Sequence, residues 1–187
     1  MPSEVVSEMI LVIAVVLMGL LVFTFVETYL APHIAFTMAQ NNANNVAQSS
    51  VLSVGPLLVN SSTDTGSAVI MFNNPSMSGY VYVITFPAPS YLQPSVGILT
   101  PTSTPSFSVY LPNGTKASEV TITSPIYDVG GQTLYDSQII AYQIPFNTPV
   151  TIKVKGVNAN DILVIWVLYY TGGYWFRVSY TFTGVPS

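Results

Sequence analysis

The sequence predicts an α+β fold in which a long hydrophobic N-terminal helix is followed by a β-sandwich domain. Fifteen consecutive apolar residues run from Met9 to Phe23, and apolar and small side chains continue at helical spacing to about residue 52. From residue 55 onward the chain consists of short segments rich in β-branched and aromatic residues, separated by turn residues. We therefore expect a helix over residues 1–52 and a head domain over residues 55–187.

The helix is expected to have an apolar part over residues 9–26 and an amphipathic part over residues 34–52. Between them, Pro32 lacks a backbone N–H donor and predicts a kink or break near residue 32. Small residues share one side of the amphipathic part, and such a stripe permits helices to approach closely. These residues are Ala35, Ala39, Ala43 and Ala47.

The apolar part has no polar face, so it must lie in lipid or be enclosed by other protein. It differs from a cleaved signal peptide, because Glu4 and Glu8 precede it without any Lys or Arg and no Ala-x-Ala site follows it. Basic residues near its ends orient a membrane span, yet the first basic residue of the chain is Lys116. We therefore expect a short basic leader, encoded upstream of Met1, to be removed from the mature protein.

Eight segments of the head domain read as strands, and the absence of helical patterns between them favours a sandwich. Gly172 and Gly173 predict a tight hairpin between the last two strands, because both can adopt positive φ. The segment 162–170 is apolar without alternation, which indicates a strand buried on both faces, and it is too short to span a membrane as a helix. The predicted strands are 67–72, 80–86, 107–111, 119–124, 134–144, 150–155, 162–170 and 174–182.

Two further segments of the head have a distinct pattern. Residues 150–155 alternate, with Lys153 and Lys155 on the outer face and Ile152 and Val154 on the inner face. The stretch from residue 87 to residue 105 contains five prolines and is predicted to be a long surface loop.

Charged residues make up only 6% of the chain. The four basic side chains are scattered, which argues against nucleic acid as a partner. A surface with so little charge repels its own copies weakly and permits identical subunits to associate closely. The basic residues are Lys116, Lys153, Lys155 and Arg177.

The sequence offers little catalytic chemistry. It has no cysteine, and its single histidine, His33, follows the proline at the predicted kink. A catalytic triad or a transition-metal site needs more than this, and Asp128 is a lone acid in a turn rather than part of a calcium loop. No glycine-rich nucleotide motif occurs. We therefore expect no enzymatic activity, no catalytic or metal-binding residues and no cofactor.

The aromatic residues of the head have two interpretations. They could line a glycan site, but strand packing and contacts between subunits are favoured. The residues concerned are Tyr80, Tyr82, Tyr110, Tyr127, Tyr135, Tyr142, Tyr169, Tyr170, Tyr174 and Trp175.

Two N-glycosylation sequons begin at Asn60 and Asn113. Each is a candidate site that requires exposure outside the cytoplasm. Short sequons also arise by chance in a chain rich in Ser, Thr and Asn.

A short acidic start, a long apolar helix that becomes amphipathic and a β-rich head together resemble type IV pilins. The part that resembles the family motif runs from Glu4 to about Phe25. A cysteine-free, all-β head is most similar to the archaeal branch, the adhesion pilins and archaellins. Bacterial pilins usually carry a glutamate at the fifth mature position, whereas here Glu4 and Glu8 lie on either side of that place.

The resemblance implies an immunoglobulin-like head and a defined sequence of processing and assembly steps. A membrane peptidase would remove the leader, the chain would wait in the membrane, and an assembly machinery would add it to a helical homopolymer. The apolar helices would form the filament core and the heads its outer surface, with adhesion as the expected role. The core residues expected on this basis are Met9, Ile10, Leu11, Ile13, Val16, Leu17, Leu20 and Phe23.

The alternative is a membrane-anchored monomer at the cell surface, in which the helix only tethers a binding domain. Two further alternatives are a virion or envelope protein with a single span and an anchored hydrolase.

Overall fold

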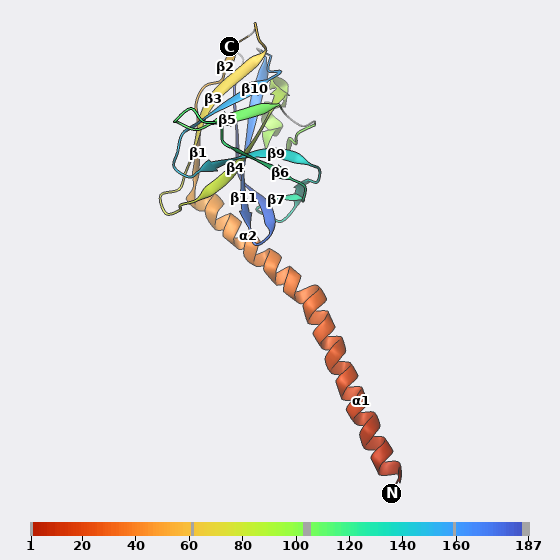
Figure 1. Ribbon diagram of the computed structural model, residues 1–187. Helices are drawn as coiled ribbons and strands as arrows, with labels where there is room; N and C mark the ends of the chain where they lie inside the picture. Colours follow the sequence, from red (N-terminus) through yellow and green to blue (C-terminus); the bar gives the residue numbers. More distant parts are fainter. Residues whose placement is uncertain (1, 61, 103–105, 159, 185–187) are drawn as a thin grey trace. The chain divides into compact units, whose positions relative to one another are not determined.

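A computed structural model describes residues 2–60, 62–102, 106–158 and 160–184 (Figure 1). The chain divides into two compact units, Met1–Met38 and Ala39–Ser187. The first unit is helical, whereas the second contains the end of the helix and all the described strands. The predicted α+β class, a long apolar helix followed by a β domain of two sheets, is confirmed.

The first unit consists of three helical segments in direct succession. Helix α1 spans Pro2–Phe25, a π-helical turn η1 spans Val26–Leu30, and α2 starts at Ala31. In the π-helical turn the backbone N–H of Ala31 donates to the carbonyl oxygen of Val26, five residues earlier. We expected a kink or break near residue 32, but the helix does not break there, and α2 runs through Pro32. The π turn ends at Leu30, two residues before the proline, and it lies where the missing N–H and the ring of Pro32 would disturb regular α-helical bonding.

The end of α2 belongs to the second unit. Helix α2 spans Ala31–Ser49, and its side chains Ala39, Ala43 and Val46 are buried. Gln40 donates a hydrogen bond from Nε2 to the carbonyl oxygen of Val129, at 3.0 Å. The predicted helix extends too far, because residues 51–54 form a strand. Ala39 and Ala43 are covered within this chain, so the close approach that we expected of the small-residue stripe takes place partly inside the chain itself.

Among the described residues, the strands form two sheets of five and seven strands. The five-stranded sheet has the order β1-β3-β10-β5, with β2 also paired to β3, and every pairing in it is antiparallel. Its strands are β1 (Val51–Val54), β2 (Leu58–Asn60), β3 (Thr65–Asn73), β5 (Phe107–Tyr110) and β10 (Val150–Lys155).

The seven-stranded sheet has the order β6-β9-β4-β11-β12-β7-β8. Strand β7 pairs with β12 in parallel, whereas the other pairings in this sheet are antiparallel. Its strands are β4 (Tyr80–Pro89), β6 (Ser118–Ile122), β7 (Ile126–Asp128), β8 (Thr133–Tyr135), β9 (Ile139–Pro145), β11 (Asp161–Thr171) and β12 (Tyr174–Thr183).

All eight predicted strands occur, with three differences in detail. The segment 134–144 is divided between β8 and β9. Strands β1, β2 and β7 were missed. The loop predicted over residues 87–105 is wrong for its first part, because β4 continues to Pro89 and a 3-10 helix, η2, spans Ser90–Ile98. The end of that predicted loop includes residues 103–105, which lie outside the described part.

Strand β11 lies at the centre of the head. Its residues 162–168 are all buried, which confirms the prediction from the lack of alternation. One face packs with Phe86, Ile122 and Val96 of η2 in a continuous cluster. The Tyr142 hydroxyl of β9 reaches the five-stranded sheet: its one proton is shared between the carbonyl oxygen of Phe107 and Glu119 Oε2, both at 3.0 Å. Thr183 Oγ1 of β12 donates to the carbonyl oxygen of Gly55, the residue after β1, at 2.8 Å. Because β11 is buried on both faces, the seven-stranded sheet is covered by apolar side chains on each side at its centre.

The turn between β11 and β12 forms as predicted. Gly172 and Gly173 have φ values of 60° and 89°, a region in which only glycine is free of steric cost.

Candidate functional site

Between Met9 and Phe23 the surface of α1 is apolar on every side. Within the described part of the chain, the eight residues expected to form a filament core are all exposed, from 49% for Ile13 to 65% for Met9. Other apolar side chains of the same helix are equally exposed, among them Val5, Val12 and Leu21. By exposure alone, the eight residues do not differ from the other apolar side chains of α1.

Helix α1 is long and apolar enough to cross a membrane by length and composition. Its most apolar window has a mean hydropathy of 3.1, and none of that window is buried within the chain. At about 1.5 Å per residue, its 24 residues extend over about 36 Å. Thr24 satisfies its hydroxyl locally by donating to the carbonyl oxygen of Leu20, at 2.8 Å. Such a helix is stable only where water is absent, in lipid or among other helices.

His33 is exposed at the start of α2, where its carbonyl oxygen accepts a hydrogen bond from Thr37 Oγ1 at 2.9 Å. Within the described residues, no group of three His, Cys, Asp or Glu side chains lies close enough together to hold a metal ion. Asp128 accepts a hydrogen bond at Oδ1 from the backbone N–H of Gln132, at 2.8 Å, which closes the β7–β8 turn.

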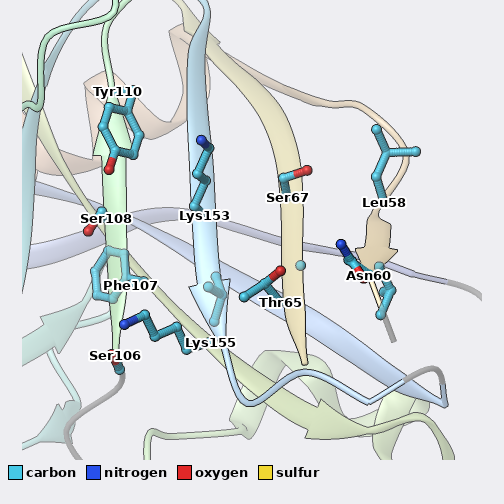
Figure 2. A pocket seen from close by; sticks show the side chains of 13 residues that line it. Leu58, Asn60, Thr65, Ser67, Ser106, Phe107, Ser108, Tyr110, Lys153 and Lys155 are labelled. Carbon is cyan, nitrogen blue, oxygen red and sulfur yellow. The ribbon is translucent and has the colours of Figure 1, made fainter. Parts of the chain in front are cut away.

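A hollow of about 520 Å³ lies on the five-stranded sheet (Figure 2). Lys153 of β10 is directly opposite Ser67 of β3 on one side and Ser108 of β5 on the other. Two residues further along β10, Lys155 is opposite Thr65. Residues directly opposite each other in a sheet share a face, so both lysines lie on the face away from buried Ile152 and Val154. The predicted outward orientation of the two lysines is confirmed.

An aromatic ring completes this hollow, which we call the basic groove and define by Ser67, Ser108, Tyr110, Lys153 and Lys155. The ammonium nitrogen of Lys153 lies 5.0 Å from the centre of the Tyr110 ring. Neither lysine forms an ion pair with an acidic side chain in the described part of the chain, and the lining contains no acidic residue. The alternation in β10 predicts the two lysines on one face, but only the register of β5 brings Tyr110 beside them.

The other candidate aromatics mostly pack against each other. The ring of Trp175 contacts those of Tyr82 and Tyr170, with centroids 4.8 and 4.7 Å apart. Tyr127 and Tyr174 form a second pair at 6.3 Å. Tyr142 is buried and contacts Phe107. The prediction of strand-packing tyrosines is thus confirmed for these residues, whereas Tyr110 lines a hollow.

Both sequon asparagines are exposed. Asn60 Oδ1 accepts a hydrogen bond from Ser62 Oγ at 2.6 Å, and Asn113 Oδ1 accepts one from Thr115 Oγ1 at 2.7 Å. In each case the acceptor is the asparagine of a sequon and the donor is the hydroxyl residue two positions later. Ser61 lies outside the described residues. Glycosylation at Asn60 and Asn113 stays a prediction.

The chain matches no family model, no curated protein and no solved structure.

Proposed function

We propose that the protein is a structural subunit of an extracellular helical filament of the type IV pilus kind, similar to the archaeal pilins. The observation that carries the proposal is the surface of α1 between Met9 and Phe23, which is exposed and apolar on all its sides. A helix in water would leave this surface unsatisfied, and a bundle of identical helices would bury it. The β domain would form the outer surface.

In this proposal the apolar surface of α1 is shielded from water both before and after assembly. Before assembly, α1 would lie in the membrane, and afterwards it would lie among copies of itself. Glu4 and Glu8 are the charged residues of α1, and both lie near its N-terminal end. The remaining surface of α1 can therefore leave lipid without uncovering a buried ion pair. A leader peptidase, an assembly machinery, glycosylation and adhesion belong to the same proposal.

Negative-stain electron microscopy of material sheared from the source cells tests this proposal. Fibres that contain this chain by mass spectrometry are the expected result. A matched chain lacking Met9–Phe23 should give soluble heads without fibres. Fibres from the truncated chain, or detergent-soluble monomers as the sole form of the complete one, would contradict a filament built on α1.

The basic groove is equally compatible with a second candidate, a membrane-anchored monomer whose head binds a ligand at the cell surface. The chain would then remain with the membrane fraction after shearing and run as a monomer in detergent. The same shearing experiment separates the two candidates.

A further inference from the structure

We propose that the basic groove binds an acidic saccharide, a sugar chain that carries carboxylate groups. The groove brings together two ammonium groups, one aromatic face and several hydroxyls on neighbouring strands (Figure 2). This goes beyond assembly, because the groove belongs wholly to the unit Ala39–Ser187. It therefore holds for a polymer and for a monomer alike.

The charge of the groove is opposite to that of the chain. The protein has a formal net charge of −4, with four basic residues against eight acidic ones. Two of those four, Lys153 and Lys155, line this one hollow. By contrast, Lys116 lies 3.3 Å from Glu119 Oε2, and Arg177 is buried. The groove is thus the place on the described part of the head where exposed ammonium groups lack an acidic partner, and it attracts an anion.

The spacing of the lysines favours an extended ligand over a small ion. Lys153 and Lys155 are two residues apart on one strand, so their attachment points are about 7 Å apart. Figure 2 shows the Lys153 ammonium directed toward Tyr110 and that of Lys155 directed toward Ser106. A hollow of about 520 Å³ is in the range of small-ligand pockets, which is about 300–1,000 Å³. One inorganic phosphate would occupy only a small part of it.

The remaining lining suits a sugar. The hydroxyls of Ser67 and Ser108 make no hydrogen bond with any described residue, and both lie next to Lys153. They can donate to and accept from sugar hydroxyls. The Tyr110 ring offers an apolar face with a phenolic hydroxyl at its end. A hydroxyl-rich ligand with carboxylates can therefore bind to the lysines, the serine hydroxyls and the Tyr110 ring of the basic groove.

Isothermal titration calorimetry of the complete chain in detergent micelles tests the proposal. The probe is trigalacturonic acid, and the matched control is the galactose trimer, in which each carboxylate is replaced by a hydroxymethyl group. We expect the acidic trimer to bind at least about tenfold more tightly than the neutral trimer, since each ion-assisted hydrogen bond contributes about a factor of ten. Binding should weaken as salt is raised, because exposed charges are screened.

Variants locate the binding in the groove. Lys153→Gln and Lys155→Gln should each weaken binding about tenfold, whereas Lys116→Gln, outside the groove, should leave it unchanged. Lys153→Arg keeps the positive charge and should retain binding, which separates loss of charge from misfolding. Tyr110→Ala should weaken binding, and Tyr91→Ala, at a tyrosine that is 78% exposed elsewhere, should not.

Four results would overturn the proposal: no heat with trigalacturonic acid, equal affinity for the neutral trimer, unchanged affinity in both groove variants, or displacement by equimolar inorganic phosphate. The last result would indicate a simple anion site. None of them concerns fibre formation, so failure here leaves the filament proposal intact. Conversely, a chain that binds the acidic trimer and never forms fibres would refute only the filament.

Discussion

Asn74 and Asn147 hold each other through two reciprocal hydrogen bonds. The backbone N–H of Asn74 donates to Asn147 Oδ1 at 2.7 Å, and Asn147 Nδ2 donates to the carbonyl oxygen of Asn74 at 3.0 Å. The side chain of Asn74 is fully buried, and its Nδ2 also donates to the hydroxyls of Ser49 and Ser50, at 2.9 Å each. The end of α2, the end of β3 and the turn before β10 therefore meet at one buried amide.

Replacing Asn74 should destabilise the head. Asn74→Ala removes the amide that donates to Ser49 and Ser50 and leaves a cavity, so we expect a loss of about 2 kcal/mol in the free energy of unfolding. Denaturant unfolding followed by tryptophan fluorescence measures it. Asn73→Ala is the matched control, because Asn73 is the neighbouring residue and is exposed. Equal losses in the two variants would show that the buried amide has no special role.

A second pair of variants tests the partner. Asn147 has a φ of 59°, in the left-handed region. Asn147→Gly and Asn147→Ala both lose the reciprocal hydrogen bonds, but alanine adds about 1 kcal/mol of backbone strain. Asn147→Ala should therefore unfold at lower denaturant than Asn147→Gly. The reverse order would contradict the strained backbone at this turn.

The stability of the head should depend more on the planar shape of the Arg177 side chain than on its charge. Its guanidinium carbon lies 4.9 Å from the Trp166 ring centre and 4.6 Å from that of Tyr180, and burial lowers its pKa from the usual value. Lysine cannot stack as a plane and is more strongly hydrated, so Arg177→Lys should cost about 2 kcal/mol. Arg177→Met keeps an apolar side chain of similar length between the rings and should cost less. Thermal unfolding measures both, and wild-type stability in Arg177→Lys would refute the stacking argument.

The head should lose stability in acid partly through Glu119. Hydrogen bonding by the Tyr142 hydroxyl, and then by Lys116, lowers the pKa of Glu119 below its usual 4.5. Its contribution to stability is present above the unfolded-state pKa and is lost as the pH falls through the lower folded-state pKa. Wild type should therefore lose more stability than Glu119→Gln as the pH falls below 4.5. Carboxyl NMR titration should show a higher Glu119 pKa in Tyr142→Phe, and an unchanged pKa would count against this hydrogen bond.

A charge within α1 should prevent assembly. In Val16→Asp or Leu20→Asp, burying an unpaired carboxylate among helices costs several kcal/mol. We expect no fibres in electron micrographs of either variant. Ile98→Asp is the control, because Ile98 is 79% exposed in the head, and it should leave fibres intact. Normal fibres from Val16→Asp would mean that this side of α1 faces water.

The periodicity of apolar residues and the local composition were sufficient to predict the long strands and the helix. Strand β11 lacks alternation because both of its faces are covered, and β10 alternates because one face is open. Strands β1, β2 and β7 were missed because three- and four-residue segments carry too little pattern to read. The run of prolines after residue 86 suggested a loop, although prolines can end a strand and begin a 3-10 helix whose Val96 covers the sheet.

Of the two candidate sites, one could be predicted from the sequence and the other could not. The surface of α1 could be predicted, because an unbroken apolar run has no alternative face. The basic groove could not, because Tyr110 and Lys153 are 43 positions apart and meet only through the pairing of β5 with β10. The amphipathic pattern indicated that Ala39 and Ala43 would be covered, but it carried no signal that the head of the same chain covers them.

The π turn at Val26–Leu30 accommodates one more residue than a regular α-helical turn would. A π turn is an α-helix with one surplus residue, so deleting Thr28 would restore even winding and turn everything before it by about 100°. The same deletion would return a carbonyl to the space beneath the ring of Pro32. Proline and surplus residue therefore compensate for each other, and a natural variant that has lost one should also have lost the other.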